Sequence, residues 1–135
     1  MKKLMSTSYA EWAINVSLLV LRIGLGALIM AHGYGKLVHF PQLKGTFLNF
    51  LHLGRTISLC LDIFAEFFCA IFLIIGLFSR LATIPLIIAM SVALFIVHNG
   101  DIFGDGEKAA LFLVGFLVIL LVGPGKASVD AMVGK

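Results

Sequence analysis

The sequence predicts an all-α membrane protein, a bundle of four transmembrane helices with a short interfacial helix between the first and the second. Hydrophobic residues make up 61% of the 135 positions. The mean hydropathy of +1.11 is higher than a soluble domain of this size can sustain. Four apolar runs have about the length that a bilayer requires, and helix-breaking residues fall between them. We therefore treat residues 1–135 as one transmembrane domain.

The four predicted spans follow from these apolar runs. The first run is too long for the hydrophobic part of a secretory signal, so we interpret it as an uncleaved helix. A short turn at Ser79 and Arg80 separates the second run from the third, and a loop rich in glycine and aspartate precedes the fourth. The fourth run is short, so its polar start must lie within the membrane boundary. The predicted spans are residues 14–38, 57–78, 81–98 and 108–122.

The interfacial helix is predicted between Pro41 and Leu53. Apolar residues recur there at helical spacing, with polar residues between them, as is typical of a helix that lies in the plane of the membrane surface. The apolar positions are Leu43, Phe47, Phe50 and Leu51.

An even number of spans places both termini and the Ser79 turn on one side of the membrane, here called side A. The two longer loops lie on the other, side B. Five basic residues on side A (Lys2, Lys3, Arg80, Lys126 and Lys135) stand against four on side B (Lys36, Lys44, Arg55 and Lys108). By the positive-inside rule, this single-charge excess favours cytoplasmic termini in a bacterial cytoplasmic (inner) membrane.

Ionisable residues gather at the side B ends of the predicted spans. A rise of about 1.5 Å per residue places them at similar depth. The first helix contributes His32 and Lys36, the second Asp62 and Glu66, the third His98, and the fourth Glu107 and Lys108. This arrangement predicts a polar cluster between the helices.

Glu66 and Arg22 need partners, because an isolated charge in the hydrocarbon region costs at least about 2.5 kcal/mol. The reachable partners of Glu66 are His32 and Arg22. Arg22 lies about 24 Å from the side B end of its helix, so it either extends to side A or reaches Glu66 across the bundle. Structural interpretations stay open: an ion pair for Glu66, an interhelical hydrogen bond for His32, and contact with water at the membrane boundary for Lys36 and Asp62.

The stripe of small residues Ala27, Ala31 and Gly35 predicts a helix-packing face on the first span. The cysteines Cys60 and Cys69 are predicted to lie on opposite faces of one helix, and the sequence contains no CxxC pair. No metal site is predicted. The net charge of +3 is too small and too scattered for nucleic-acid binding.

Several segments together resemble the DoxX family, and the resemblance runs from Leu18 to Asp130. The segments are LRIGLGALIMAHGYGKL (21–37), AEFFCAIFLIIGLFSRLA (65–82), VHNGD (97–101), GEKAALF (106–112) and GPGKASVD (123–130). The positions that match the family pattern are Arg22, His32, Gly33, Lys36, Glu66, Gly76, Arg80, His98, Glu107 and Gly123 to Gly125. The resemblance implies a four-helix membrane protein that is an oxidoreductase or an oxidoreductase subunit, with relatives tied to thiosulfate or quinone redox systems.

The favoured hypothesis is a membrane redox component that handles a quinone or a small oxidisable substrate at the side B cluster. Electrons then require a bound quinone or a redox partner protein, since the sequence has no paired cysteines and no nucleotide fingerprint. A bis-histidine haem between His32 and His98 is disfavoured. The expected catalytic residues are Glu66, His32 and His98, and the expected substrate-binding residues are Lys36, Glu107, Arg22 and Asp62.

Two other classes remain open. Acids and histidines within a helix bundle also suit a proton-linked carrier of a small solute or ion. The third class is a non-catalytic assembly subunit of a membrane-associated redox complex. A homo-oligomer is compatible with each of the three.

Overall fold

A computed structural model describes residues 4–47, 49 and 52–134, and this part of the chain is helical and contains no strand. Two of the helical segments are π-helical and carry the symbol η. The elements in chain order are α1 (Glu11–Val38), α2 (Phe40–Leu43), α3 (Arg55–Ile63), η2 (Phe64–Cys69), α4 (Ala70–Ile75), α5 (Ser79–Val92), η3 (Ala93–Val97), α6 (Glu107–Val122) and α7 (Val129–Val133).

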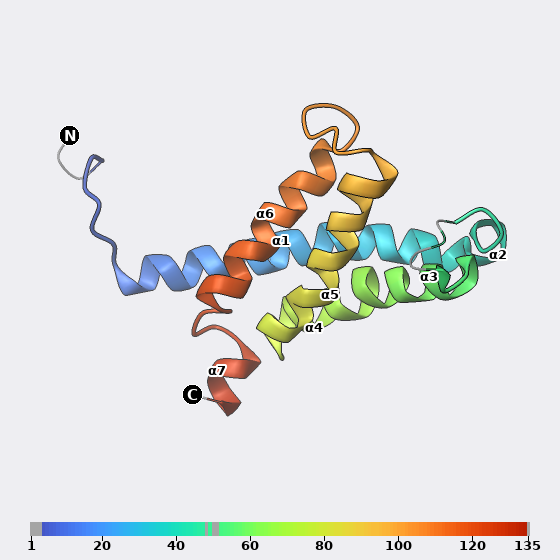
Figure 1. Ribbon diagram of the computed structural model, residues 1–135. Coiled ribbons are helices and arrows are strands. Elements are labelled where there is room, and N and C mark those ends of the chain that lie inside the picture. Colours follow the sequence, from blue (N-terminus) through green and yellow to red (C-terminus); the bar gives the residue numbers. More distant parts are fainter. Residues whose placement is uncertain (1–3, 48, 50–51, 135) are drawn as a thin grey trace.

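The helices form two hairpins that cross each other (Figure 1). In the first hairpin, the continuous rod of α3, η2 and α4 packs along α1. In the second, α6 packs against α5 and η3. The two hairpins meet where α5 contacts η2 and where α6 contacts α1. The predicted all-helical fold is confirmed, and its helices cross obliquely instead of lying parallel.

Three of these helices are long and apolar enough to cross a membrane. They are Glu11–Val38, Arg55–Ile75 and Ser79–Val97, with lengths of 28, 21 and 19 residues. Large apolar side chains remain exposed along all of them, as a lipid-facing surface requires. The chain is therefore a multi-pass membrane protein. The fourth predicted span corresponds to α6, which has 16 residues and falls short of the length that the other three reach.

The packing face of α1 differs from the predicted one. Ala27 and Ala31 are exposed, and a Cβ atom added at Gly35 would have no neighbour within 4 Å. The buried residues of α1 are instead Leu18, Arg22, Gly26, Ile29 and Gly33. The predicted small-residue stripe is thus wrong for packing within the chain.

The interfacial helix between the first two spans is shorter than predicted. Its regular part is the four-residue α2, which is followed by turns through Gly45 and Thr46. Phe50 and Leu51, which belong to the predicted apolar face, lie outside the described residues. So do the predicted side A basic residues Lys2, Lys3 and Lys135.

The π-helical segment η2 lies near the middle of the second span, and η3 lies at the side B end of the third. A π-helical turn inserts an extra residue and is often found at functional sites. Glu66 lies within η2, and the N–H of His98 closes η3 by donating to the Ala93 carbonyl at 3.0 Å. Two of the predicted site residues are therefore positioned by non-standard helical turns.

Candidate functional site

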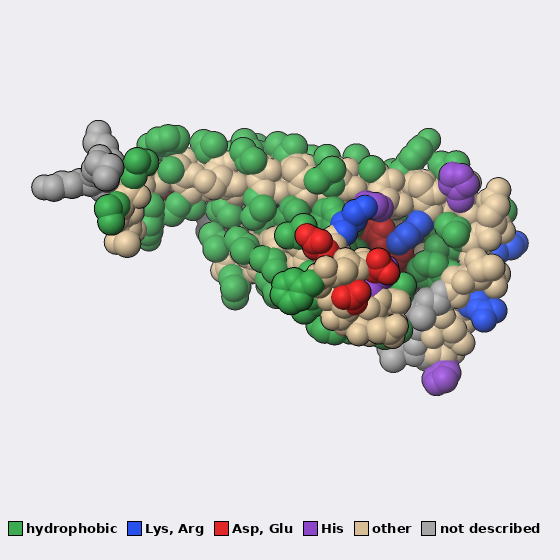
Figure 2. Space-filling model, turned by 90° about the horizontal axis from the view of Figure 1, so that it is seen from above, with side chains coloured by type: hydrophobic (Ala, Val, Ile, Leu, Met, Phe, Trp, Pro, Cys, Tyr) green, Lys and Arg blue, Asp and Glu red, His purple; other side chains and the backbone are tan. Residues whose placement is uncertain are grey.

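A cavity of about 290 Å³ opens at the side B end of the helices. Figure 2 looks onto the face that carries the loop between η3 and α6, and shows acidic, basic and histidine side chains gathered around a hollow in a largely hydrophobic surface. The titratable residues that line this side B cavity are His32, Lys36, Glu66, His98, Asp105 and Lys108. Residues from α1, η2, the end of η3 and the start of α6 thus converge on one space.

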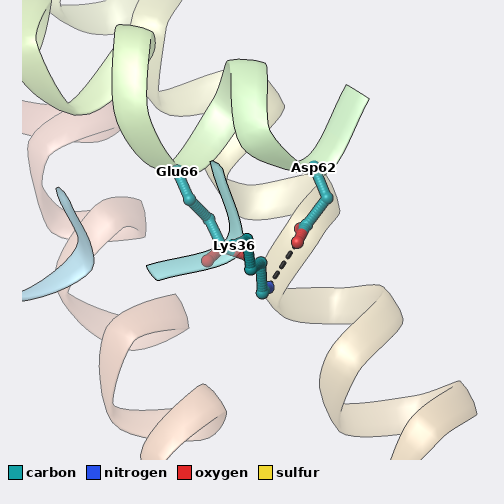
Figure 3. Close-up of polar contacts among 3 residues, drawn as sticks. All are labelled: Lys36, Asp62 and Glu66. Carbon is teal, nitrogen blue, oxygen red and sulfur yellow. Dashed lines mark hydrogen bonds and ion pairs between the residues drawn. The ribbon is translucent and has the colours of Figure 1, made fainter. Parts of the chain in front are cut away.

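Lys36 joins the two acidic residues of the second span. Its Nζ atom donates to Glu66 Oε2 at 2.6 Å and also forms an ion pair with Asp62 Oδ2 (Figure 3). The Glu66 side chain is 3% exposed, that of Asp62 14% and that of Lys36 30%. The two acids lie four residues apart, which places both on one helix face within reach of a single ammonium group. The expected partners of Glu66, His32 and Arg22, were therefore wrong.

Gly33 allows α1 to approach the backbone of η2 at Glu66. A Cβ atom at position 33 would lie 2.7 Å from the Glu66 carbonyl carbon and 2.8 Å from the Phe67 nitrogen. Distances below about 3 Å are not sustained between such atoms, so only glycine fits without displacing a helix. Lys36 follows Gly33 by about one turn, and this close contact brings its ammonium group to the two carboxylates.

The two histidines face the same cavity from different helices. The His32 ring meets the edge of Phe112 at a centroid distance of 6.3 Å, with the ring planes at 88°. Neither imidazole has a hydrogen-bond partner among the described residues. The ring nitrogens of His32 and His98 are therefore available to a ligand in the cavity.

Four of the seven predicted site residues line the side B cavity, and Asp62 joins them through Lys36. Glu107 is exposed and does not line the cavity, whereas its neighbour Lys108 does, because successive residues on a helix point about 100° apart. Asp105 was not predicted as a site residue. Its position in the glycine-rich loop just before α6 is the sequence signal that could have indicated it.

Arg22 lies at the opposite end of the molecule. The residue is 1% exposed, and its guanidinium donates from Nη2 to the Ala127 carbonyl at 2.6 Å. A Cβ atom at Gly76 would lie 2.0 Å from Arg22 Nη1, so the left-handed glycine that ends α4 leaves room for the arginine. Of the two alternatives for Arg22, the structure shows side A and not Glu66.

Asp130 caps the start of α5 from the C-terminal segment. Its Oδ1 accepts from the Phe78 N–H at 2.7 Å, and its Oδ2 accepts from the Ser79 N–H at 2.8 Å. Burial alone raises the pKa of Asp130, but these backbone donors and the nearby Arg22 charge together hold it below its usual value. Arg22 and Asp130 thus tie the C-terminal segment to the middle of α1 and to the side A ends of α4 and α5.

These features define a polytopic helical membrane protein with a charged cavity at one membrane face and a tightly hydrogen-bonded opposite end. Comparison with protein-family models gives a match to DoxX over residues 17–99, which is more than half of the chain. The protein belongs to the DoxX family, as the sequence resemblance predicted. No curated protein and no solved structure matches the chain.

Proposed function

We propose that the side B cavity binds the headgroup of a quinone and that the protein is a membrane redox component. The observation that carries this proposal is the placement of two unpartnered imidazoles, His32 and His98, beside the Lys36–Glu66 ion pair in one cavity at the membrane boundary. A quinone headgroup offers carbonyl oxygens that accept hydrogen bonds, and imidazole and ammonium groups donate them.

The charges of the cavity favour a neutral ligand. Lys36 and Lys108 balance Glu66 and Asp105 at the cavity wall, and Asp62 adds a further negative charge behind Lys36. An anionic substrate such as thiosulfate finds no excess positive charge here, whereas a neutral quinone requires none.

The chain's own residues handle protons in this proposal. Reduction of a quinone to a quinol takes up electrons and an equal number of protons. The imidazoles of His32 and His98 line the cavity and are placed to donate protons to the carbonyl oxygens, while Glu66 and Asp62 orient Lys36. The electrons come from a reduced partner protein. Both this partner and a homo-oligomer remain predictions from the sequence.

A thermal-shift measurement tests this function. A short-chain quinone that binds only the folded protein should raise the melting temperature of the detergent-purified protein by several degrees at saturating concentration. His32→Ala should reduce this shift. His39→Ala is the matched control, because His39 is exposed and lies outside the cavity.

Two results contradict the redox proposal. One is the absence of a quinone-dependent shift in the wild-type protein. The other is an equal loss of the shift in the His32 and His39 variants. Solute-dependent proton movement in proteoliposomes, without a quinone shift, would instead support a proton-linked carrier.

We also propose that α6 is a fourth span. Arg80 Nη2 donates to the Val122 carbonyl at 3.2 Å, and a Cβ atom at Gly106 would lie 2.6 Å from Leu94 Cδ1. The two ends of α6 are therefore level with residues 80 and 94 of the third span. Four spans support the predicted topology, with cytoplasmic termini in a bacterial cytoplasmic membrane.

A further inference from the structure

A second cavity lies at the side A end of the molecule, where the C-terminal segment forms part of its lining. It has a volume of about 370 Å³, and it lies where the α4–α5 turn, the end of α6 and the segment leading to α7 come together (Figure 1). We call it the side A cavity. It is separate from the proposed quinone site, because its lining residues belong to the opposite ends of α5 and α6.

The side A cavity holds one basic and one acidic side chain, Arg80 and Asp130. Arg80 donates from Nη2 to the Val122 carbonyl, and a guanidinium has further N–H donors for a ligand. Gly123 has a φ of +99°, and a Cβ atom there would lie 3.1 Å from Arg80 Nη2, so the glycine leaves room for this position of the guanidinium. The backbone of the turn therefore fixes Arg80 at the cavity.

Asp130 retains acceptor capacity although it caps α5. Each of its oxygens accepts one backbone N–H, from Phe78 and Ser79, and a carboxylate oxygen accepts more than one hydrogen bond. Arg80 and Asp130 form no ion pair with each other in the described structure. Two opposite charges are thus held apart in one cavity, an arrangement that complements a zwitterion.

The rim of the side A cavity is apolar and exposed. Phe78, Leu81 and Val122 line the cavity and are 61%, 64% and 52% exposed. Exposed apolar residues continue from this rim at helical spacing along both helices of the second hairpin: Ile84 and Ile88 on α5, and Val118 and Val114 on α6. In a membrane protein, such stripes contact acyl chains.

We propose that the side A cavity binds an aminophospholipid. Arg80 binds the lipid phosphate, Asp130 accepts hydrogen bonds from the headgroup ammonium, and the acyl chains lie along the exposed stripes of α5 and α6. Guanidinium–phosphate and ammonium–carboxylate hydrogen bonds are both charge-assisted, which makes them stronger than neutral ones. This inference does not depend on the proposed redox function.

Native mass spectrometry of the detergent-purified full chain tests the proposal. The probes are phosphatidylethanolamine, phosphatidylcholine, whose quaternary ammonium has no N–H donor, and phosphatidylglycerol, which has no ammonium. We expect phosphatidylethanolamine to bind about tenfold more tightly than the other two, the difference typical of one hydrogen bond to a charged group. Equal binding of the three lipids would overturn the proposal.

Variants assign the binding to the cavity. Arg80→Gln should weaken phosphatidylethanolamine binding about tenfold or more. Arg55→Gln is the matched control, because Arg55 lies at the start of α3, on side B, and should leave binding unchanged. Asp130→Asn keeps an acceptor for the α5 cap and should abolish the preference for phosphatidylethanolamine over phosphatidylglycerol. An equal effect of the Arg80 and Arg55 variants would overturn the proposal even if the Asp130 variant fails to fold.

Discussion

Lys36 controls the charge balance of the side B cavity, because one ammonium group contacts both Asp62 and Glu66. Without it, two carboxylates would lie one helical turn apart, one of them almost fully buried. Removing one partner of a buried ion pair leaves an uncompensated charge, and this usually destabilises a protein more than removing both partners.

The first prediction tests this ion-pair network. Lys36→Met should lower the free energy of unfolding in detergent by about 2 kcal/mol, below the range for fully buried pairs because Lys36 is partly exposed. Adding Glu66→Gln to Lys36→Met should recover part of this loss, since the variant then buries no unpaired charge at position 66. Thermal melting of the two variants measures the difference.

Lys108→Met provides the control for this comparison. Lys108 lines the same cavity but is exposed and forms no ion pair in the described part of the chain, so its loss should change the stability by less than about 0.5 kcal/mol. If the double variant at Lys36 and Glu66 melts no higher than the single variant, the unpaired charge of Glu66 is not the cause of the lost stability.

The choice of partner for Glu66 could not be predicted from the sequence. Counting residues from the membrane boundary gives the depth of each charge, and this count correctly placed His32, Lys36, Glu66 and His98 near one another. It gives no information on how each helix is rotated about its own axis. Rotation decides whether Lys36 or His32 meets the carboxylate, and it depends on packing across the whole interface.

Among the elements, the contact between α1 and η2 determines the geometry of the proposed quinone site. Small residues recur on two faces of α1: Gly26 and Gly33 on one face, and Ala27, Ala31 and Gly35 on the other. The buried Arg22 lies on the same face as Gly26 and Gly33. A charge in the middle of a membrane helix must face protein, so Arg22 was the signal that could have identified the packing face.

The second prediction compares two glycines on α1. Gly33→Ala places a methyl group against the η2 backbone and should destabilise the protein by about 1–3 kcal/mol, as overpacking does. Gly35→Ala meets no atom within 4 Å and should leave the stability unchanged or slightly higher. The two melting temperatures in detergent measure the difference. Equal melting temperatures would mean that α1 and η2 do not make this close contact in the membrane.

In the whole molecule, the hydrophobic pattern predicted most of the helices but not their arrangement. The runs of apolar residues located all four long helical segments within a few residues, because burial of the backbone in lipid requires continuous helices. The crossing of the two hairpins has no such signal. It arises from contacts between residues far apart in the chain, such as Gly33 with Glu66 and Gly115 with Leu25.

The C-terminal segment was also beyond the reach of the hydropathy pattern. Residues 123–131 are polar and rich in glycine, which predicts a loop outside the membrane. Within the structure, the segment accepts a hydrogen bond from Arg22, caps α5 and lines the side A cavity. These contacts are individual hydrogen bonds to residues far away in the sequence. They form only when the helices are already packed, so hydropathy does not predict them.

The last prediction concerns the number of spans, which depends on α6. At about 1.5 Å per residue, its 16 residues extend about 24 Å, less than the hydrocarbon thickness of about 30 Å. A short helix can still cross where the bilayer thins around it. In a background without Cys60 and Cys69, single cysteines replacing Lys44, Phe103 and Met132 report the side of each segment through a membrane-impermeant thiol reagent.

All three probe positions are exposed, Phe103 at 96% and Met132 at 75%, so the reagent can reach them. If α6 crosses the membrane, the cysteines at Lys44 and Phe103 label from the periplasm, and the cysteine at Met132 labels only after the membrane is opened. If α6 remains on one side, the cysteines at Phe103 and Met132 label together.

The internal control is the common labelling of the Lys44 and Phe103 positions. Lys44 precedes the second span and Phe103 follows the third, and both of these helices are long and apolar enough to cross a membrane. Labelling of all three positions only in opened membranes would also place residues 103 and 132 on one side of the membrane, and would therefore contradict a fourth span.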